Sequence, residues 1–292
     1  MDVLRKWAFS IPVLLFGATA FGQTAGPAPA ISPGDLIRAV VANELNPQVD
    51  RSHWMYDVEK EEDGNKQTKQ VVQLREFSVS RLTAINGQEL LPAKRQEETA
   101  RIEKLVSHVS ERQKLEEVQK KDAEQCEAFF RLIPDAFLFN YEGHEGELIR
   151  VGFKPNPVFQ PSSREARVFH ALEGEILVEA KQRRLAAISG HLVEDVKFGG
   201  GLLGHLEKGG RFSVKRSEIA PAQWALTGME VDMKGKALLL KTIAVQQREY
   251  RRNFRKLADD LSVAEAANIL MVASLLPRTT SKPAGFPGLA LN

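Results

Sequence analysis

A glycine-rich segment is the first candidate for chemistry in this sequence. Gly199, Gly201 and Gly204 have the spacing G-x-G-x-x-G, which binds a dinucleotide when the third glycine opens a helix inside a βαβ unit. Here two more glycines follow at once, at 209 and 210, and the flanking residues alternate as strands do. We therefore interpret the segment as a mobile connection between strands that forms a lid or entrance lip. The residues assigned to this lid are Phe198, Gly201, Leu202 and Leu203.

Acidic and histidine side chains gather once, in the segment 142–147, which contains three glutamates and His144. Gly143 and Gly146 bracket a turn inside this segment, so we expect a hairpin tip with solvated charges and predict neither a metal site nor a cofactor. Glu194 and Asp195 are adjacent in a predicted strand, where they would point to opposite faces. No G-x-S-x-G occurs, because Ser189-Gly190 lacks the first glycine. An exported hydrolase would need a convergent polar set that the sequence does not present.

Cys126 is the single cysteine, so the chain forms no intramolecular disulfide. It lies at helical spacing from Phe129, Phe130 and Ile133. That spacing predicts a small buried residue, with a reactive thiol as the alternative.

The composition limits the class of partner. The chain has 292 residues, 43% of them hydrophobic, which is enough for a substantial core. Its net charge of +2 lacks the basic excess that nucleic-acid binding requires, so no nucleic-acid partner is expected.

The N-terminus has the pattern of a secretory signal. Arg5 and Lys6 precede an apolar run over 7–16 and the small residues Ala18-Thr19-Ala20. We predict a signal peptide over 1–22, cleaved between Ala20 and Gly22, and a periplasmic or secreted protein. Because no cysteine lies at the predicted cleavage site after the apolar run, no lipid anchor is expected, and no later segment is long enough to span a membrane.

Beyond the signal, residues 23–34 are rich in Pro, Gly and Ala and predict a linker. A single domain is expected over 35–276, followed by a disordered tail over 277–292. A helix begins after Ser32 and ends near Asn46-Pro47, and another over 262–276 begins with a capping box of Ser262 and Glu265.

Alternating apolar residues predict an antiparallel sheet. Five consecutive strands are expected over 164–254, and earlier hairpins turn at Asp63-Gly64 and Asn86-Gly87. A closing hairpin is expected at Lys234-Gly235. Gly174 and Gly228 lie inside strand patterns and predict bulges or bends, hence a strongly curved sheet.

A charged helix is predicted over 92–133, between Pro92 and Pro134. Unbroken, it would be about 60 Å long at about 1.5 Å per residue, so it must bend, break or protrude. Its charges predict either a solvated face or a surface that binds an envelope protein partner.

The order of these elements resembles the periplasmic outer-membrane lipoprotein-sorting family, LolA-like and LolB-like, and more loosely other exported bacterial proteins. The resemblance rests on the export signal, the short helix, the Trp54-x-Tyr56 strand, the hairpins, the strand after Gly174-Glu175-Ile176 and the long strands that follow. It implies an α+β, mainly β fold: an open, strongly curved antiparallel sheet, or half-barrel, around a hydrophobic cavity with helices as a lid. The helix at 92–133 would be an insertion.

The leading functional hypothesis is a non-catalytic binding protein for a lipid, acyl chain or other apolar ligand in the half-barrel. The predicted ligand-binding residues are Trp224, Leu226, Leu240 and Phe212. The alternative is an envelope interaction or sensor module whose core is filled by its own side chains and whose helix 92–133 meets a partner.

Overall fold

The computed structural model describes residues 31–46, 52–75, 77–161, 163, 165–198, 204–237 and 241–273. The predicted signal peptide, most of the predicted linker and the predicted tail lie outside these residues. Within them, no helix is long and apolar enough to cross a membrane.

Strands make up most of the described secondary structure. The strands are β1 (Trp54–Glu62), β2 (Asn65–Gln73), β3 (Ser78–Ile85), β4 (Gln88–Glu89), β5 (Phe137–Glu145), β6 (Leu148–Pro155), β7 (Leu172–Glu179), β8 (Arg184–Leu192), β9 (Val196–Phe198), β10 (Gly204–Leu206), β11 (Arg211–Ala220), β12 (Gln223–Ala237) and β13 (Lys241–Lys256). The helices are α2 (Pro33–Glu44), α3 (Pro92–Ser107), α4 (Val109–Ala136), α5 (Val263–Ala273) and the short 3-10 helix η1 (Glu165–Ala171).

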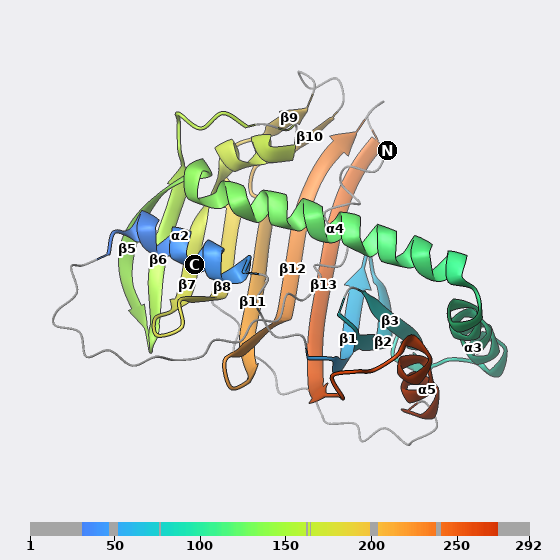
Figure 1. The fold of residues 1–292 in the computed structure, drawn as a ribbon. Helices are drawn as coiled ribbons and strands as arrows, with labels where there is room; N and C mark the ends of the chain where they lie inside the picture. The colour runs from blue at the N-terminus through green and yellow to red at the C-terminus, as the bar shows by residue number, and fades with distance from the viewer. Residues whose placement is uncertain are drawn as a thin grey trace, which may run out of the picture.

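These strands form one antiparallel sheet in the order β4-β3-β2-β1-β13-β12-β11-β8-β7-β6-β5 (Figure 1). The short strands β9 and β10 pair with each other, and β10 also pairs with the end of β12. The sheet is not closed, because β4 and β5 stand at its opposite ends. The predicted α+β, mainly β class with an open antiparallel sheet is therefore confirmed.

The first two hairpins turn where the sequence predicts. Asp63 and Gly64 have φ of 49° and 79°, and Asn86 and Gly87 have φ of 51° and 77°. Two central residues with positive φ are what a type I′ hairpin turn requires, and Asn-Gly and Asp-Gly adopt that conformation most readily. These turns fix the register of β1 with β2 and of β3 with β4.

The predicted single helix over 92–133 is two helices. The helical geometry is interrupted at His108, whose φ of −113° and ψ of 103° are extended, and α4 begins at Val109. The break divides the predicted helix into pieces of 16 and 28 residues, so the expectation that it must bend, break or protrude is met by a break. Pro134 does not stop the helix; it lies in the last turn of α4, which ends at Ala136.

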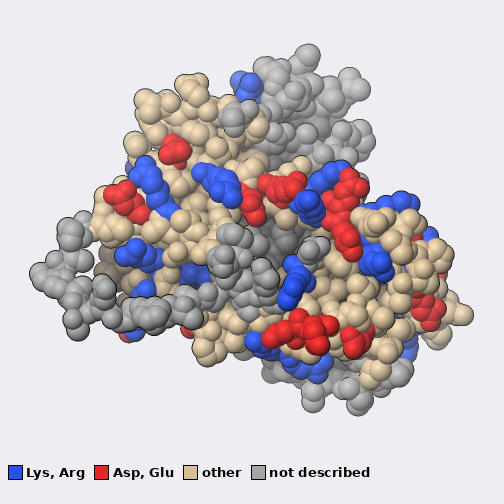
Figure 2. Space-filling view, viewed as in Figure 1, with Lys and Arg blue, Asp and Glu red and all other residues tan. Residues whose placement is uncertain are grey.

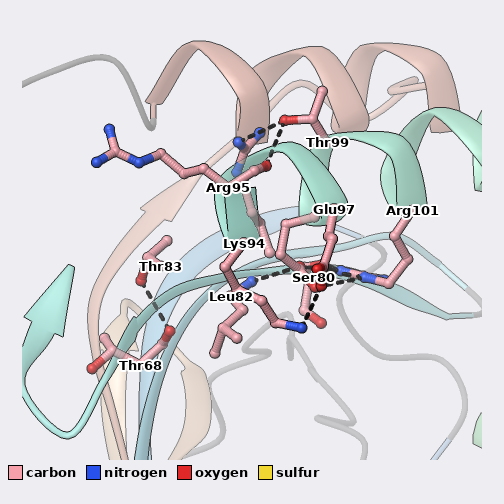
Figure 3. Close-up of polar contacts among 11 residues, drawn as sticks. Thr68, Ser80, Leu82, Thr83, Lys94, Arg95, Glu97, Thr99 and Arg101 are labelled. Atoms are coloured by element: carbon pink, nitrogen blue, oxygen red, sulfur yellow. Dashed lines mark hydrogen bonds and ion pairs between the residues drawn. The ribbon is translucent and has the colours of Figure 1, made fainter. Parts of the chain in front are cut away.

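Polar contacts fasten α3 to strand β3 (Figure 3). The backbone N–H of Leu82 donates to Glu98 Oε2 at 3.0 Å, and Arg81 Nη2 donates to Thr99 Oγ1 at 3.0 Å. Farther along, the Gln119 side chain of α4 accepts from the backbone N–H of the first residue of β3 at 2.8 Å and donates to its carbonyl at 2.9 Å. The N-terminal half of α4 is thus tied to strand β3.

Three predictions inside the long strand region are wrong. Residues 165–171 form η1 rather than a strand, and the predicted strand over 184–198 is divided into β8 and β9 by a bend at 193–195. Lys234 and Gly235 do not turn; they pair with Ala244 and Ile243 inside the β12–β13 ladder. Residues 238–240, between these two strands, lie outside the described residues.

The two strand glycines serve different purposes. Gly228 adjoins a register shift, because Lys215 pairs with Gly228 while Arg216 pairs with Leu226, so the predicted bulge is confirmed. Gly174 lies in regular pairing with Gly190. A Cβ at Gly174 would stand only 2.0 Å from the carbonyl oxygen of Ser189, so this glycine permits close backbone approach instead.

Buried apolar residues form separate clusters. The largest joins α2, the C-terminal half of α4 and η1 to strands β5–β8 and parts of β9–β12. A second joins α3 and α5 to Met55 and Val72 of β1 and β2. Trp54 and Tyr56 belong to a third cluster. Since successive strand residues point to opposite faces, β1 is covered differently on its two sides.

The last helix begins as predicted. The Ser262 backbone N–H donates to Glu265 Oε2 at 2.8 Å, and the Glu265 backbone N–H donates to Ser262 Oγ at 3.2 Å, which is a capping box.

Candidate functional site

A carboxylate at the end of α2 is the centre of a buried ionic cluster. Glu44 is 3% exposed and accepts two parallel hydrogen bonds from Arg184 of β8, at 2.8 Å from Nε and 3.0 Å from Nη2. The Leu185 backbone N–H donates to the same carboxylate at 3.1 Å. This bidentate geometry is the strong form of the arginine–carboxylate pair, and it fixes α2 to the sheet.

Arg216 of β11 shares this carboxylate. Its Nη1 lies 3.1 Å from Glu44 Oε2, and its Nη2 donates to the Trp224 carbonyl at 3.0 Å. The third donor group, Nε, is buried and has no hydrogen-bond partner among the described residues. Burial lowers the pKa of Arg216; Glu44 opposes this effect, and the guanidinium of Arg184 adds to it.

A second ionic pair lies on β13. Arg251 is 6% exposed and donates from Nε and Nη2 to Glu249 Oε1, at 2.8 and 2.7 Å. The same guanidinium stands 5.6 Å from the ring centroid of Tyr56. Burial alone would lower the pKa of Arg251, but Glu249 and Tyr56 raise it. Burial raises the pKa of the Tyr56 hydroxyl.

Helix α4 places Cys126 beside this cluster. Burial raises the pKa of the Cys126 thiol to about 11, and the nearby Arg216 guanidinium opposes the rise. The thiol is therefore protonated at neutral pH and is a poor nucleophile. Cys126 is only partly buried in the structure, so the prediction of a buried residue is confirmed only in part.

Among the described residues, Trp224 and Phe212 of the predicted ligand-binding set lie apart from each other. Trp224 is buried with Leu177 and Ala186, and its Nε1 donates to Gln182 Oε1 at 3.1 Å. Phe212 packs against the largest cluster and is only partly buried. Trp224 pairs with Glu218 and Phe212 with Val231, near opposite ends of the β11–β12 ladder.

Leu226 is buried and pairs with Arg216, so among the predicted ligand residues it is nearest in register to the ionic cluster. Leu240 lies outside the described residues, as do the predicted lid residues Gly201, Leu202 and Leu203.

The glycine motif does not have the setting of a nucleotide site. Phe198 ends β9 and pairs with Gly204, which opens strand β10 rather than a helix. The segment between them therefore connects two paired strands, as the sequence analysis favours. Among the described residues, no helix begins at Gly204, whereas a dinucleotide site requires one at the third glycine.

The carboxylates singled out in the sequence are used locally. Glu145 pairs with Arg150, and Asp195 accepts from the Lys208 backbone N–H at 2.8 Å. Asp195 lies between β8 and β9 rather than within a strand, so the predicted strand position of Glu194 and Asp195 is wrong. Over the described ranges, no group of three or more His, Cys, Asp or Glu side chains could hold a metal ion.

Two hollows open on the surface away from the ionic cluster. One of about 380 Å³ lies between the start of α2 and the start of β5, lined by Arg38, Phe137 and Asn156 among others. The other, of about 750 Å³, lies between the α3–α4 junction and the start of α5, with Phe77, Val106 and other apolar residues along it.

Sequence reasoning missed Glu44, Arg184 and Arg216. One signal was present: Glu44 continues the apolar spacing of Leu36, Ile37, Val40 and Val41, so a carboxylate stands on the buried stripe of α2. A charge at such a position predicts a buried cationic partner. No protein-family model matches this sequence, and neither does any curated protein.

Proposed function

We propose that this protein is a non-catalytic, exported binding protein that holds an acyl chain or other apolar ligand between the open sheet and helix α4. The proposal treats residues 35–276 as one LolA-like domain, its sheet curved as a half-barrel. The bulge beside Gly228 supports curvature, because an extra residue in one strand bends it and increases its twist.

The observation that carries this proposal is that apolar side chains of α4 and of strand β11 remain only partly buried. Phe129 and Phe130 of α4 pack in the same cluster as Phe212 and Val214 of β11, yet all four stay partly exposed. In contrast, the residues of α2 in this cluster, such as Ile37, are fully buried. Apolar side chains that stay partly exposed in a shared cluster are the kind of lining that we expect for a space that takes an apolar ligand.

The outer side of α4 differs from this inner side. Figure 2 shows acidic and basic side chains mixed over the face that α4 crosses. Salt bridges such as Glu117 with Lys121 occupy that side, at 66% exposure each. Helix α4 thus has the amphipathic character that a lid requires, with a solvated outer face and an apolar inner face toward its C-terminal half.

Native mass spectrometry of protein purified from the periplasm tests the proposal. We expect a lipid-sized adduct on the wild-type protein. Val214→Trp fills the proposed space and should remove the adduct while leaving the fold intact. Val118→Trp is the matched control, because Val118 is 56% exposed on α4 and the same enlargement there should keep the adduct. A bare protein mass for wild type contradicts the proposal.

The alternative, an envelope interaction module, has one observation in its favour. Aromatic rings fill much of the main cluster by themselves; Phe137 lies 4.7 Å from Phe153 and 5.3 Å from Phe169, measured between ring centroids. In that case α4 would present Val118 and its charges to a partner protein. Absence of an adduct, together with a co-purifying protein that Val118→Glu releases, would establish this alternative.

A further inference from the structure

The two ends of the sheet differ in how their outward backbone groups are used. At one end, β4 pairs only with the last two residues of β3. Along the rest of β3, side chains of the helices bond the backbone: Glu98 accepts from the Leu82 N–H, and Arg101 donates to the Ser80 carbonyl (Figure 3). Gln119 bonds both backbone groups of the first residue of β3. These bonds occupy the groups that an added strand would use, so this end is closed.

The end formed by β5 has no such cover among the described residues. The Asn156 backbone N–H donates to the Ala136 carbonyl at 2.9 Å, which fixes the phase of the β5–β6 ladder. Groups that point toward and away from the neighbouring strand alternate in an antiparallel ladder, so those of Phe139 and Tyr141 point away from β6. No described strand or side chain bonds these outward groups. They are open to an added strand.

The first half of β5 lacks the devices by which edge strands avoid pairing. Residues 137–141 carry no charge, and Leu138 and Tyr141 are 56% and 45% exposed. The irregular pairing between Tyr141 and Gly143, and the charge of Glu142, come only after this segment. A regular, uncharged edge with exposed apolar side chains favours pairing with another strand.

A hollow beside this edge leaves room for a side chain of the added strand. The hollow of about 380 Å³ between the starts of α2 and β5 has Leu138 and Phe139 in its lining. A residue opposite Phe139 on an added strand would lie on the same face of the sheet, next to this hollow. Tyr141 is on that face as well, and its hydroxyl donates to the Ile31 carbonyl at 2.8 Å, which holds the ring at the edge.

We propose that β5 is a dimer interface, at which it pairs antiparallel with β5 of a second copy of this chain about a two-fold axis at Asn140. The second copy is the occupant because the segment complements itself in this register. Phe139 of each copy lies opposite Tyr141 of the other, which places two aromatic pairs beside the two hollows. On the other face Asn140 meets its own counterpart, and Leu138 meets the stem of Glu142, so no like charges are opposed. The contact is small, and we expect a reversible dimer.

Disulfide trapping tests the register in a Cys126→Ser background, which removes the native cysteine. Asn140→Cys places two thiols directly opposite each other at a position without hydrogen bonds. The Cα atoms there are about 4.5 Å apart, within the range of about 4.4–6.8 Å that disulfides span. Leu138→Cys is the matched control: it is exposed on the same face, but its two copies would be four residues apart, or about 13 Å.

We expect mild oxidation to give a covalent dimer with Asn140→Cys and none with Leu138→Cys. Equal cross-linking of the two variants would indicate random collision and overturn the proposal. The absence of a covalent dimer with Asn140→Cys would overturn it as well.

Sedimentation equilibrium measures the association without cross-linking. The mass of the wild-type protein should rise toward twice the monomer mass as its concentration increases. Tyr141→Lys puts a charge on the edge and should leave a monomer, whereas Val272→Lys, at a 57% exposed position on α5, should keep the dimer. A wild-type protein that stays monomeric contradicts the proposal, and so does a dimer that Tyr141→Lys leaves intact.

The same variants separate a second copy from a different partner. A complex with another protein that Tyr141→Lys releases, in place of a dimer, would overturn the assignment to a second copy. If Tyr141→Lys does not fold, the two cysteine variants decide the question by themselves, since both changes are at exposed positions.

Discussion

Replacing Glu44 by glutamine tests the ionic cluster, because the change keeps the size of the side chain and removes its charge. Arg184 and Arg216 would then remain buried without their shared counter-ion. Removing one partner of a buried ion pair costs about 3–5 kcal/mol, far above the value for exposed pairs. At about 2–4 °C per kcal/mol for a domain of this size, the unfolding midpoint should fall by about 6–20 °C.

The assay is urea and thermal unfolding followed by circular dichroism. The matched control is Glu117→Gln, which makes the same chemical change in an exposed ion pair: Glu117 and its partner Lys121 are each 66% exposed. The control should leave the midpoint unchanged within error. If Glu44→Gln is as mild as the control, the cluster is not the buried anchor of α2 that we describe.

Three other perturbations probe the packing. Gly174→Ala puts a Cβ 2.0 Å from a β8 carbonyl and should cost about 1–3 kcal/mol or more in urea unfolding, whereas Gly34→Ala, with nothing closer than 3.7 Å, should not destabilise; equal stabilities would refute the close approach. Because burial raises the Cys126 pKa from 9.0 to about 11, iodoacetamide at pH 8 should alkylate folded protein about 100-fold more slowly than unfolded protein. Between pH 9 and 11 the folded state keeps the Cys126 proton that the unfolded state releases. The stability that this thiol contributes is therefore fully present below pH 9 and is lost as the pH rises toward 11, and a free energy of unfolding that is independent of pH across this window would contradict it. Gln119→Ala removes the polar anchor of α4 and should speed amide hydrogen exchange at the start of β3, and unchanged exchange would count against that anchor.

Local signals predicted the elements that depend on local chemistry. The turns at Asp63-Gly64 and Asn86-Gly87 follow from residues that tolerate positive φ, and the capping box of α5 follows from the spacing of Ser262 and Glu265. The antiparallel sheet follows from alternation over many residues. These features need no knowledge of distant contacts.

The failures occur where distant contacts decide. Alternation alone cannot separate the 3-10 turn at 165–171 from a strand, because its apolar residues fill the core beside α4 rather than one face of the sheet. The predicted turn at Lys234-Gly235 is overridden by the continuous β12–β13 ladder. A glycine within a strand pattern predicts a bulge or bend. Gly174 instead allows the backbone of β8 to approach closely, which only the folded structure shows.

The ionic cluster could be predicted only in part. Glu44 and Arg184 are 140 residues apart in the sequence, and their pairing follows from the docking of α2 on β8. The position of Glu44 on an apolar stripe indicates that a cationic partner exists, but periodicity does not identify it. Arg216 could not be predicted for the same reason: the sequence pattern does not distinguish it from the other basic residues in strands.

The most direct test of the central claim is the mass of the wild-type protein under native conditions, set against its mass after denaturation in organic solvent. The account predicts a native excess equal to one lipid-sized molecule, recovered in the organic phase. Identical native and denatured masses, from protein prepared without detergent, would contradict it.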